Sequence, residues 1–234
     1  MIGMKNQCFG VEVEMTGLTR GQAAQALANY FGTEPYYVGG GYDKWSVKDP
    51  DGKVWSIMSD SSIVMEMKTE SGYMHTSNIE YRVEMVTPKL TYAELPRLQE
   101  CVRQVRHAGA KVNSSCGIHV HVDAANHNRQ SLKNLLSIMY SKEDILFKAL
   151  QVNSSRVSQY CQKVREPMLF RWNAQAKSAF AGIQLRRDDF FFYEEAGSAR
   201  TILQSPIPLA NKAPRSGAKA NAAVGGAGAS IAFV

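Results

Sequence analysis

Strict alternation of apolar and polar side chains marks residues 9–15 and 79–85 of this chain and the second half of residues 113–123. A period of two residues is that of a β-strand, whose successive side chains point to opposite faces. Each segment therefore predicts a strand with one apolar face, suited to a protein core, and one polar face. The polar faces carry Glu12, Glu14, Glu80, Arg82, Glu84, His119, His121 and Asp123.

Helical patterns separate and follow the predicted strands. Thr19 and Gln22 have the spacing of a capping box ahead of an apolar stripe, and residues 95–107 are amphipathic with a helical period. Two further helices are predicted, at residues 132–140 and, after a new cap, at residues 145–150. We therefore expect an α+β fold, with a mainly antiparallel, curved sheet, helices on its apolar face and an open polar face.

The polar faces form a candidate metal site if the three strands share one sheet. The side chains that would then converge are Glu12, Glu14, Glu84, His119 and His121. Carboxylates suit Mg²⁺ or Mn²⁺, and imidazoles shift the preference toward Mn²⁺. The alternatives are three solvated strand faces, or an internal ion pair through Arg82. Asp60 lies in a polar break in the β pattern, where it either faces the site or caps its own backbone.

Composition excludes several classes of protein. Four cysteines without a C-x-x-C pair argue against a zinc knuckle and a dithiol redox site. Most of the net charge of +6 comes from Arg200, Lys212, Arg215 and Lys219, which follow the last acid, Glu195. The body is thus only weakly basic, and the tail has no aromatic residues among its basic groups, which argues against a nucleic-acid partner. We see no secretory signal and no membrane span, and expect a cytoplasmic protein.

Four motifs, in order, carry a resemblance to a known family. They are FGVEVE from Phe9, SDSSI from Ser59, YRVEMVTPKL from Tyr81 and NSSCGIHVHVD from Asn113. Together they resemble the amidoligase family, a branch of the glutamine synthetase-like carboxylate–amine ligases, over residues 9–164. The resemblance implies an antiparallel sheet whose concave face holds ATP and divalent cations. It also implies an ATP-dependent reaction that forms an amide bond through an acyl phosphate.

The resemblance also assigns roles to single residues. By similarity, Glu12, Glu14, Glu84 and His119 match the metal ligands of the family. The metals would be Mg²⁺ or Mn²⁺, which bridge phosphate oxygens and neutralise charge during phosphoryl transfer. Glu84 would thereby take part in catalysis as well as in metal binding.

Four other positions belong to the expected nucleotide and substrate site. By similarity, His121 would lie near the ATP phosphates and act in catalysis, and Asp60 would orient the incoming amine or another substrate group. Arg82 and Lys89 are both close enough in sequence to contact phosphate, and the sequence does not choose between them.

The C-terminal part departs from the family pattern. The resemblance implies a later strand with an E-x-R motif, in which the arginine steadies the transferring phosphate, and no match follows Arg165. We therefore predict a catalytic domain over residues 1–165, a weakly structured extension over 166–195 and a disordered basic tail rich in Pro, Ala and Gly over 196–234. On this interpretation the sheet is incomplete, and an altered reading of the gene could leave the chain inactive.

Alternative functions stay open at this point. One is a metal-dependent hydrolase built on His119 and His121, with a metal-bound water as nucleophile. Another is a non-catalytic binding protein that uses its basic tail. The family resemblance implies small-molecule or peptide carboxylates and amines as substrates, and peptide modification in phages or mobile elements. An unclosed sheet edge would favour a homo-oligomer.

Overall fold

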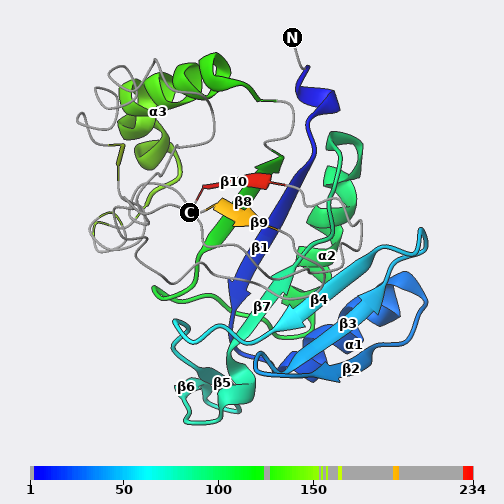
Figure 1. Ribbon diagram of the computed structural model, residues 1–234. Helices are drawn as coiled ribbons and strands as arrows, with labels where there is room; N and C mark the ends of the chain where they lie inside the picture. The colour runs from blue at the N-terminus through cyan, green and yellow to red at the C-terminus, as the bar shows by residue number, and fades with distance from the viewer. Residues whose placement is uncertain are drawn as a thin grey trace, which may run out of the picture.

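A mainly antiparallel sheet organises the computed structural model, which describes residues 3–123, 127–152, 154, 157, 163–164, 192–194 and 229–233. All neighbouring strand pairs of this eight-stranded sheet are antiparallel (Figure 1). In spatial order the strands are β2 (Tyr36–Gly39), β3 (Lys44–Lys48), β4 (Val54–Met58), β7 (Val83–Val86), β1 (Phe9–Met15), β8 (Ile118–Asp123), β10 (Ala229–Phe233) and β9 (Phe192–Glu194). The first strand of the chain, β1, thus lies between β7 and β8.

The helices and a small hairpin surround this sheet. The described α-helices are α1 (Arg20–Phe31), α2 (Leu95–His107) and α3 (Arg129–Ala149), and the short 3₁₀ helices are η1 (Met4–Asn6), η2 (Ile79–Tyr81) and η3 (Tyr92–Glu94). A separate two-stranded hairpin consists of β5 (Glu66–Thr69) and β6 (Gly72–His75). In Figure 1, α3 lies on the far side of β8 from α1 and α2.

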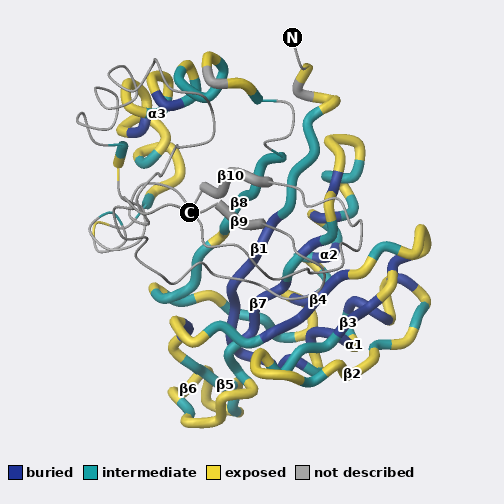
Figure 2. The backbone as a smooth tube through the Cα atoms, viewed as in Figure 1, coloured by how far each residue is buried: buried dark blue, intermediate teal, exposed yellow. Residues whose placement is uncertain are grey.

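The hydrophobic core lies between the sheet and two of the helices. Helix α1 packs on β3, β4 and β7, and α2 packs on α1. Figure 2 shows the buried part of the chain where β1, β7 and β4 run beside α1. The larger core side chains include Leu27, Trp55, Ile57, Met85, Leu90 and Leu98. The predicted α+β fold with a mainly antiparallel sheet is confirmed, and α1 and α2 lie on the apolar side of the sheet, whereas α3 does not join them there.

Local sequence signals set the limits of α1 and α2. The Thr19 hydroxyl accepts a hydrogen bond from the Gln22 backbone N–H, and the Gln22 side chain accepts one from the Thr19 N–H, which is the predicted capping box. Gly32 then ends α1 with a left-handed φ of 69°. Helix α2 covers the same residues, 95–107, as the amphipathic pattern predicted.

The predicted strand at residues 79–85 is wrong in its first half. Residues 79–81 form η2, and β7 begins only at Val83. The Asn78 side chain accepts a hydrogen bond from the Glu80 N–H and starts the 3₁₀ turn. The Arg20 guanidinium then donates to the carbonyls of Ile79 and Arg82 at 2.6 and 2.9 Å, which holds both ends of the turn. Glu80 is exposed as a result.

The segment 113–123 forms a strand only in its alternating second half. Its first residues form a turn, in which the Asn113 carboxamide oxygen accepts from the Ser115 N–H at 3.0 Å, and β8 begins at Ile118. Ile118 is 60% exposed, although the alternation predicted it for the core.

The break predicted within the helical region after residue 132 is wrong. Helix α3 is continuous, because the Ser141 hydroxyl donates back to the Ile138 carbonyl and starts no new cap. Residues 132–140 and 145–150 therefore belong to one helix and its C-cap.

Two strands from the C-terminal part of the chain extend the sheet beyond β8. Strand β10 pairs with β8, with Ala232 opposite His121, and β9 pairs with β10. Both strands lie after residue 165, and β10 lies within residues 196–234, for which we predicted disorder. The described part of that tail is therefore a strand, while most of residues 166–234 lies outside the described residues. Neither strand contains an arginine.

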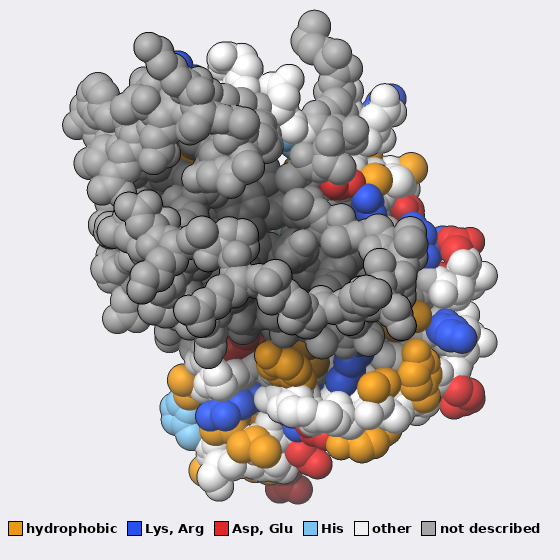
Figure 3. All heavy atoms as spheres, in the orientation of Figure 1, with side chains coloured by type: hydrophobic (Ala, Val, Ile, Leu, Met, Phe, Trp, Pro, Cys, Tyr) orange, Lys and Arg blue, Asp and Glu red, His pale blue; other side chains and the backbone are white. Residues whose placement is uncertain are grey.

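None of the described helices has the length and apolar character needed to cross a bilayer. The face seen in Figure 3 mixes acidic, basic and hydrophobic side chains over its described part.

Candidate metal and nucleotide site

The register of three neighbouring strands brings the predicted polar residues together. On β1, Glu12 lies opposite His119 of β8, and Glu14 lies opposite Glu84 of β7. His121 lies opposite Gly10, which has no side chain to separate it from Glu12. Because β1 is the central strand of the three, its two carboxylates are flanked from both sides.

Close contacts link the two histidines with the carboxylates of β1. His119 Nδ1 lies 3.1 Å from Glu12 Oε2, and His119 Nε2 lies 3.5 Å from Glu14 Oε1. His121 Nε2 lies 3.4 Å from Glu12 Oε1. The carboxylates are buried, with only 6% of Glu12, 3% of Glu14 and 0% of Glu84 exposed. The alternative of solvated strand faces is thus wrong for these residues.

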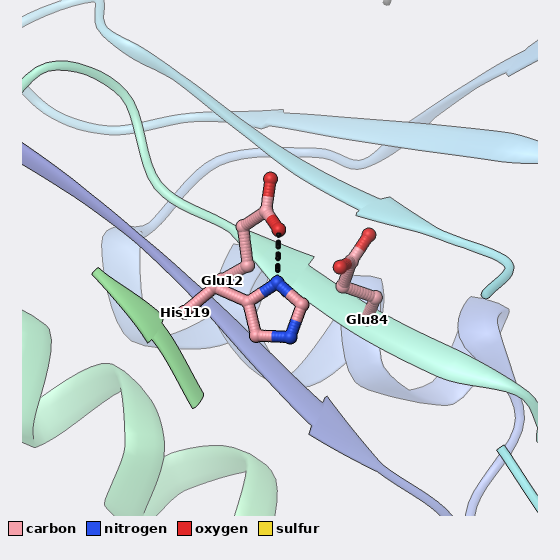
Figure 4. Close-up of side chains that lie close together, drawn as sticks. All are labelled: Glu12, Glu84 and His119. Carbon is pink, nitrogen blue, oxygen red and sulfur yellow. Dashed lines mark hydrogen bonds and ion pairs between the residues drawn. The ribbon is translucent and has the colours of Figure 1, made fainter. Parts of the chain in front are cut away.

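The structure contains two groups of three side chains, and within each group the potential ligand atoms lie within 4.8 Å of one another. Glu12, Glu84 and His119 form the first group, and Figure 4 shows them around one point, with the contact between His119 and Glu12 drawn as a dashed line. Glu14, Asp60 and Glu84 form the second group. Glu84 belongs to both groups, so the two candidate cation sites share one carboxylate.

The charge of this cluster makes a cation favourable. Buried carboxylates that face one another repel, and burial also removes the water that would solvate them. Burial lowers the pKa of His119, but its hydrogen bond to Glu12 and the charges of the surrounding glutamates outweigh this and raise that pKa above its ordinary value of 6.5. Oxygen-rich groups with one imidazole fit Mg²⁺ or Mn²⁺.

A model of a known protein family covers most of the chain. The family model described as "Putative amidoligase enzyme" matches residues 5–205. The chain belongs to this amidoligase family. The searches of curated proteins and of solved structures gave no match. The family match extends past residue 165, beyond which the sequence analysis found no match to the family pattern.

Asp60 both caps its own loop and faces the site, the two roles that its sequence context allowed. Its Oδ1 accepts hydrogen bonds from the N–H and the hydroxyl of Ser62, at 2.7 and 2.6 Å, so it caps its own loop. Its carboxylate also lies with Glu14 and Glu84 in the second group. The two hydrogen bonds from Ser62 use Asp60 Oδ1 and do not involve Oδ2.

The two basic residues that were candidates for phosphate contact, Arg82 and Lys89, differ in their surroundings. Lys89 Nζ lies 2.6 Å from Asp123 Oδ2, and 64% of the Lys89 side chain is exposed. Arg82 has a buried Nε that finds no hydrogen-bond acceptor among the described residues. Its backbone is extended, so its side chain leaves on the same side as that of Glu84, two residues later.

The sequence analysis did not predict the pair of hydrogen bonds between Gly117 and Glu14 at this site. The Gly117 N–H donates to Glu14 Oε2 at 2.6 Å, and the Glu14 N–H donates to the Gly117 carbonyl at 3.0 Å. The signal available in the sequence was a glycine close before the two histidines, since such a residue allows close backbone approach.

Proposed function

We propose that the chain is an ATP-dependent carboxylate–amine ligase with a glutamine synthetase-like fold. The observation that carries this proposal is the pair of ligand groups that share Glu84, at the centre of an antiparallel sheet in an amidoligase-family chain. Two adjacent cation sites suit phosphoryl transfer, in which charge on phosphate oxygens must be neutralised on more than one side.

The two donor sets support one position for each cation. Glu12, Glu84 and His119 would hold one, and Glu14, Asp60 and Glu84 the other. When bound, Mg²⁺ or Mn²⁺ supplies positive charge that neutralises phosphate oxygens and stabilises the charge that develops between ATP and the acceptor carboxylate. The carboxylates of the chain then serve as ligands instead of repelling the nucleotide.

The other residues bind and orient the reactants. In the first step a substrate carboxylate oxygen attacks the γ-phosphorus of ATP, and ADP leaves. In the second step an amine nitrogen attacks the acyl carbon, phosphate leaves, and the amine loses a proton. We assign Arg82 to the transferring phosphate and His121 to the nucleotide phosphates. Asp60, which the resemblance assigned to the orientation of the amine, would instead serve as a ligand of the second cation.

Arg82 is the better candidate for phosphate contact because its buried Nε finds no acceptor among the described residues, whereas Lys89 is paired with Asp123. A guanidinium also binds phosphate through two parallel hydrogen bonds, which an ammonium group cannot do. On this assignment Arg82 takes the place of the arginine that the sequence lacks in the C-terminal strands.

The test is calorimetric titration of the full chain with Mg²⁺-ATP, followed by an assay of phosphate release with panels of amines and carboxylates. We expect binding by the wild type, strong loss of binding in Glu14→Gln, and wild-type binding in Glu80→Gln, whose glutamate is exposed on η2. Phosphate release should require both an amine and a carboxylate. Hydrolysis without nucleotide would instead support the metal-dependent hydrolase, and nucleotide binding without turnover would support an inactive descendant.

A further inference from the structure

The two proposed cation sites differ in how the chain holds their ligands. Glu12, Glu84 and His119 all lie on strands of the sheet, so backbone hydrogen bonds between neighbouring strands fix their positions. In the second group, Asp60 lies on the loop between β4 and β5. The sheet alone does not fix that loop, so the second site needs another means of positioning.

Two side chains of the turn before β8 hold this loop. The Asn113 carboxamide donates from Nδ2 to the Val64 carbonyl at 2.9 Å, and the Val64 N–H donates to the Ser115 hydroxyl oxygen at 2.9 Å. The Ser115 hydroxyl in turn donates to Asn113 Oδ1 at 2.6 Å. Both backbone polar groups of Val64, four residues after Asp60, are thus held by one pair of side chains.

The same turn also holds the second ligand of this site. Gly117, two residues after Ser115, donates its N–H to Glu14 Oε2 at 2.6 Å. A turn that shifts therefore moves the hydrogen bond to Glu14 and the loop of Asp60 together. The first group has no ligand on this loop and lacks Glu14.

The loop has a separate anchor in the core. Ile63 is 1% exposed, and its burial keeps the loop attached to the body of the protein when the side-chain hydrogen bonds are removed. Val64 itself is 47% exposed and contributes little packing. The hydrogen bonds to the Val64 backbone fix, in addition, the orientation of the loop next to Ile63.

We propose that Asn113 and Ser115 are positioning residues for the Glu14–Asp60–Glu84 cation site and leave the Glu12–Glu84–His119 site unaffected. This inference rests on the proposed function, because it requires that both groups bind cations. Partners that orient metal ligands without touching the metal change affinity by roughly 10–100-fold when removed. We expect a loss of this size at one site only.

The experiment is a titration of the metal-free full chain with Mn²⁺, followed by calorimetry and by electron paramagnetic resonance of free Mn²⁺. The wild type should bind two ions. Ser115→Ala and Asn113→Ala should bind one ion with unchanged affinity and the other roughly 10–100-fold more weakly. Ser115→Thr keeps the hydroxyl and should restore the weak site. Matched controls are Ser137→Ala and Asn29→Ala, whose side chains form hydrogen bonds within their own helices.

Three results would overturn the inference. Unchanged affinity at both sites in Ser115→Ala and Asn113→Ala would show that the hydrogen bonds do not position ligands. Equal weakening of both sites, together with a lower melting temperature of the metal-free variant, would show a general structural role. Absence of Mn²⁺ binding by the wild type would overturn the proposed function itself, and with it this inference, which separates the two failures.

Discussion

Removing the charge of Glu84 should stabilise the metal-free protein and should destabilise the metal-bound protein, each relative to the wild type in the same condition. The Glu84 side chain is fully buried, lies opposite Glu14 and belongs to both ligand groups. The substitution Glu84→Gln keeps the shape of the side chain and one acceptor oxygen but removes the negative charge. The variant therefore tests the charge of this residue with little change in packing.

The size of the effect follows from the separation of the charges. Ligand atoms in each group lie within 4.8 Å, and two like charges at that distance repel by about 3.5 kcal/mol at an effective dielectric constant of 20. Glu84 has such a neighbour in each group, Glu12 and Glu14, while the contact of His119 Nδ1 with Glu12 at 3.1 Å offsets part of this repulsion. We expect the metal-free variant to be more stable than the wild type by about 1–3 kcal/mol, or about 2–12 °C in melting temperature.

Cation binding should reverse this order. A ligand at 100 times its dissociation constant stabilises the folded state by about 2.7 kcal/mol, and the wild type would gain this at two sites. Glu84→Gln lacks the carboxylate that both sites share and should gain much less. In thermal unfolding followed by circular dichroism, the variant should therefore melt above the wild type with a chelator and below it with excess Mn²⁺.

Glu80→Gln is the matched control, because Glu80 precedes the same strand but is exposed on η2. It should follow the wild type in both conditions. A Glu84→Gln variant that melts below the wild type in chelator would refute the repulsion between the carboxylates. A variant with the full Mn²⁺ response would refute the assignment of Glu84 to both cation sites.

Three further predictions concern single side chains. Thr19→Ala removes the cap of α1 and should lower the free energy of unfolding by about 1 kcal/mol in urea titration, with Thr19→Ser near wild type. The hydrogen bond from Tyr37 is the largest of the causes that hold the pKa of Asp43 below its ordinary value of 3.8, so the stability lost in Asp43→Asn should be constant above that pH and shrink as the pH falls below it. Arg82→Ala should weaken Mg²⁺-ATP binding in calorimetry by about 10- to 100-fold, while Lys89→Ala should change it much less.

The polar face of the site could be predicted from the sequence because a strand period fixes which side chains share a face. Glu12 and Glu14 need only the alternation of β1, and that pattern holds over its full length. The helices at residues 20–31 and 95–107 followed from capping and apolar periodicity in the same way. Each of these signals is local, so distant parts of the chain did not need to be known.

The errors arose where distant side chains decide the local structure. Residues 79–82 alternate like a strand, but Arg20, about 60 residues earlier, binds the carbonyls at both ends of that segment. The turn at residues 113–117 is held in part by the backbone of Val64, another distant segment. No local pattern in either segment reports such contacts, so the strand at residues 79–85 was predicted too long and the turn at residues 113–117 was not predicted.

Strand register, which the sequence pattern left open, decides which polar side chains of neighbouring strands lie opposite each other in the site. Alternation places Glu12 and Glu14 on one face, but only the pairing with β7 and β8 sets Glu14 against Glu84 and Glu12 against His119. A shift of two residues along β8 would keep every polar side chain on the same face. It would nevertheless place His121, instead of His119, opposite Glu12, and the first ligand group would lose its geometry. The hydrogen bonds between Glu14 and Gly117 lie just before β8, so they oppose that shift.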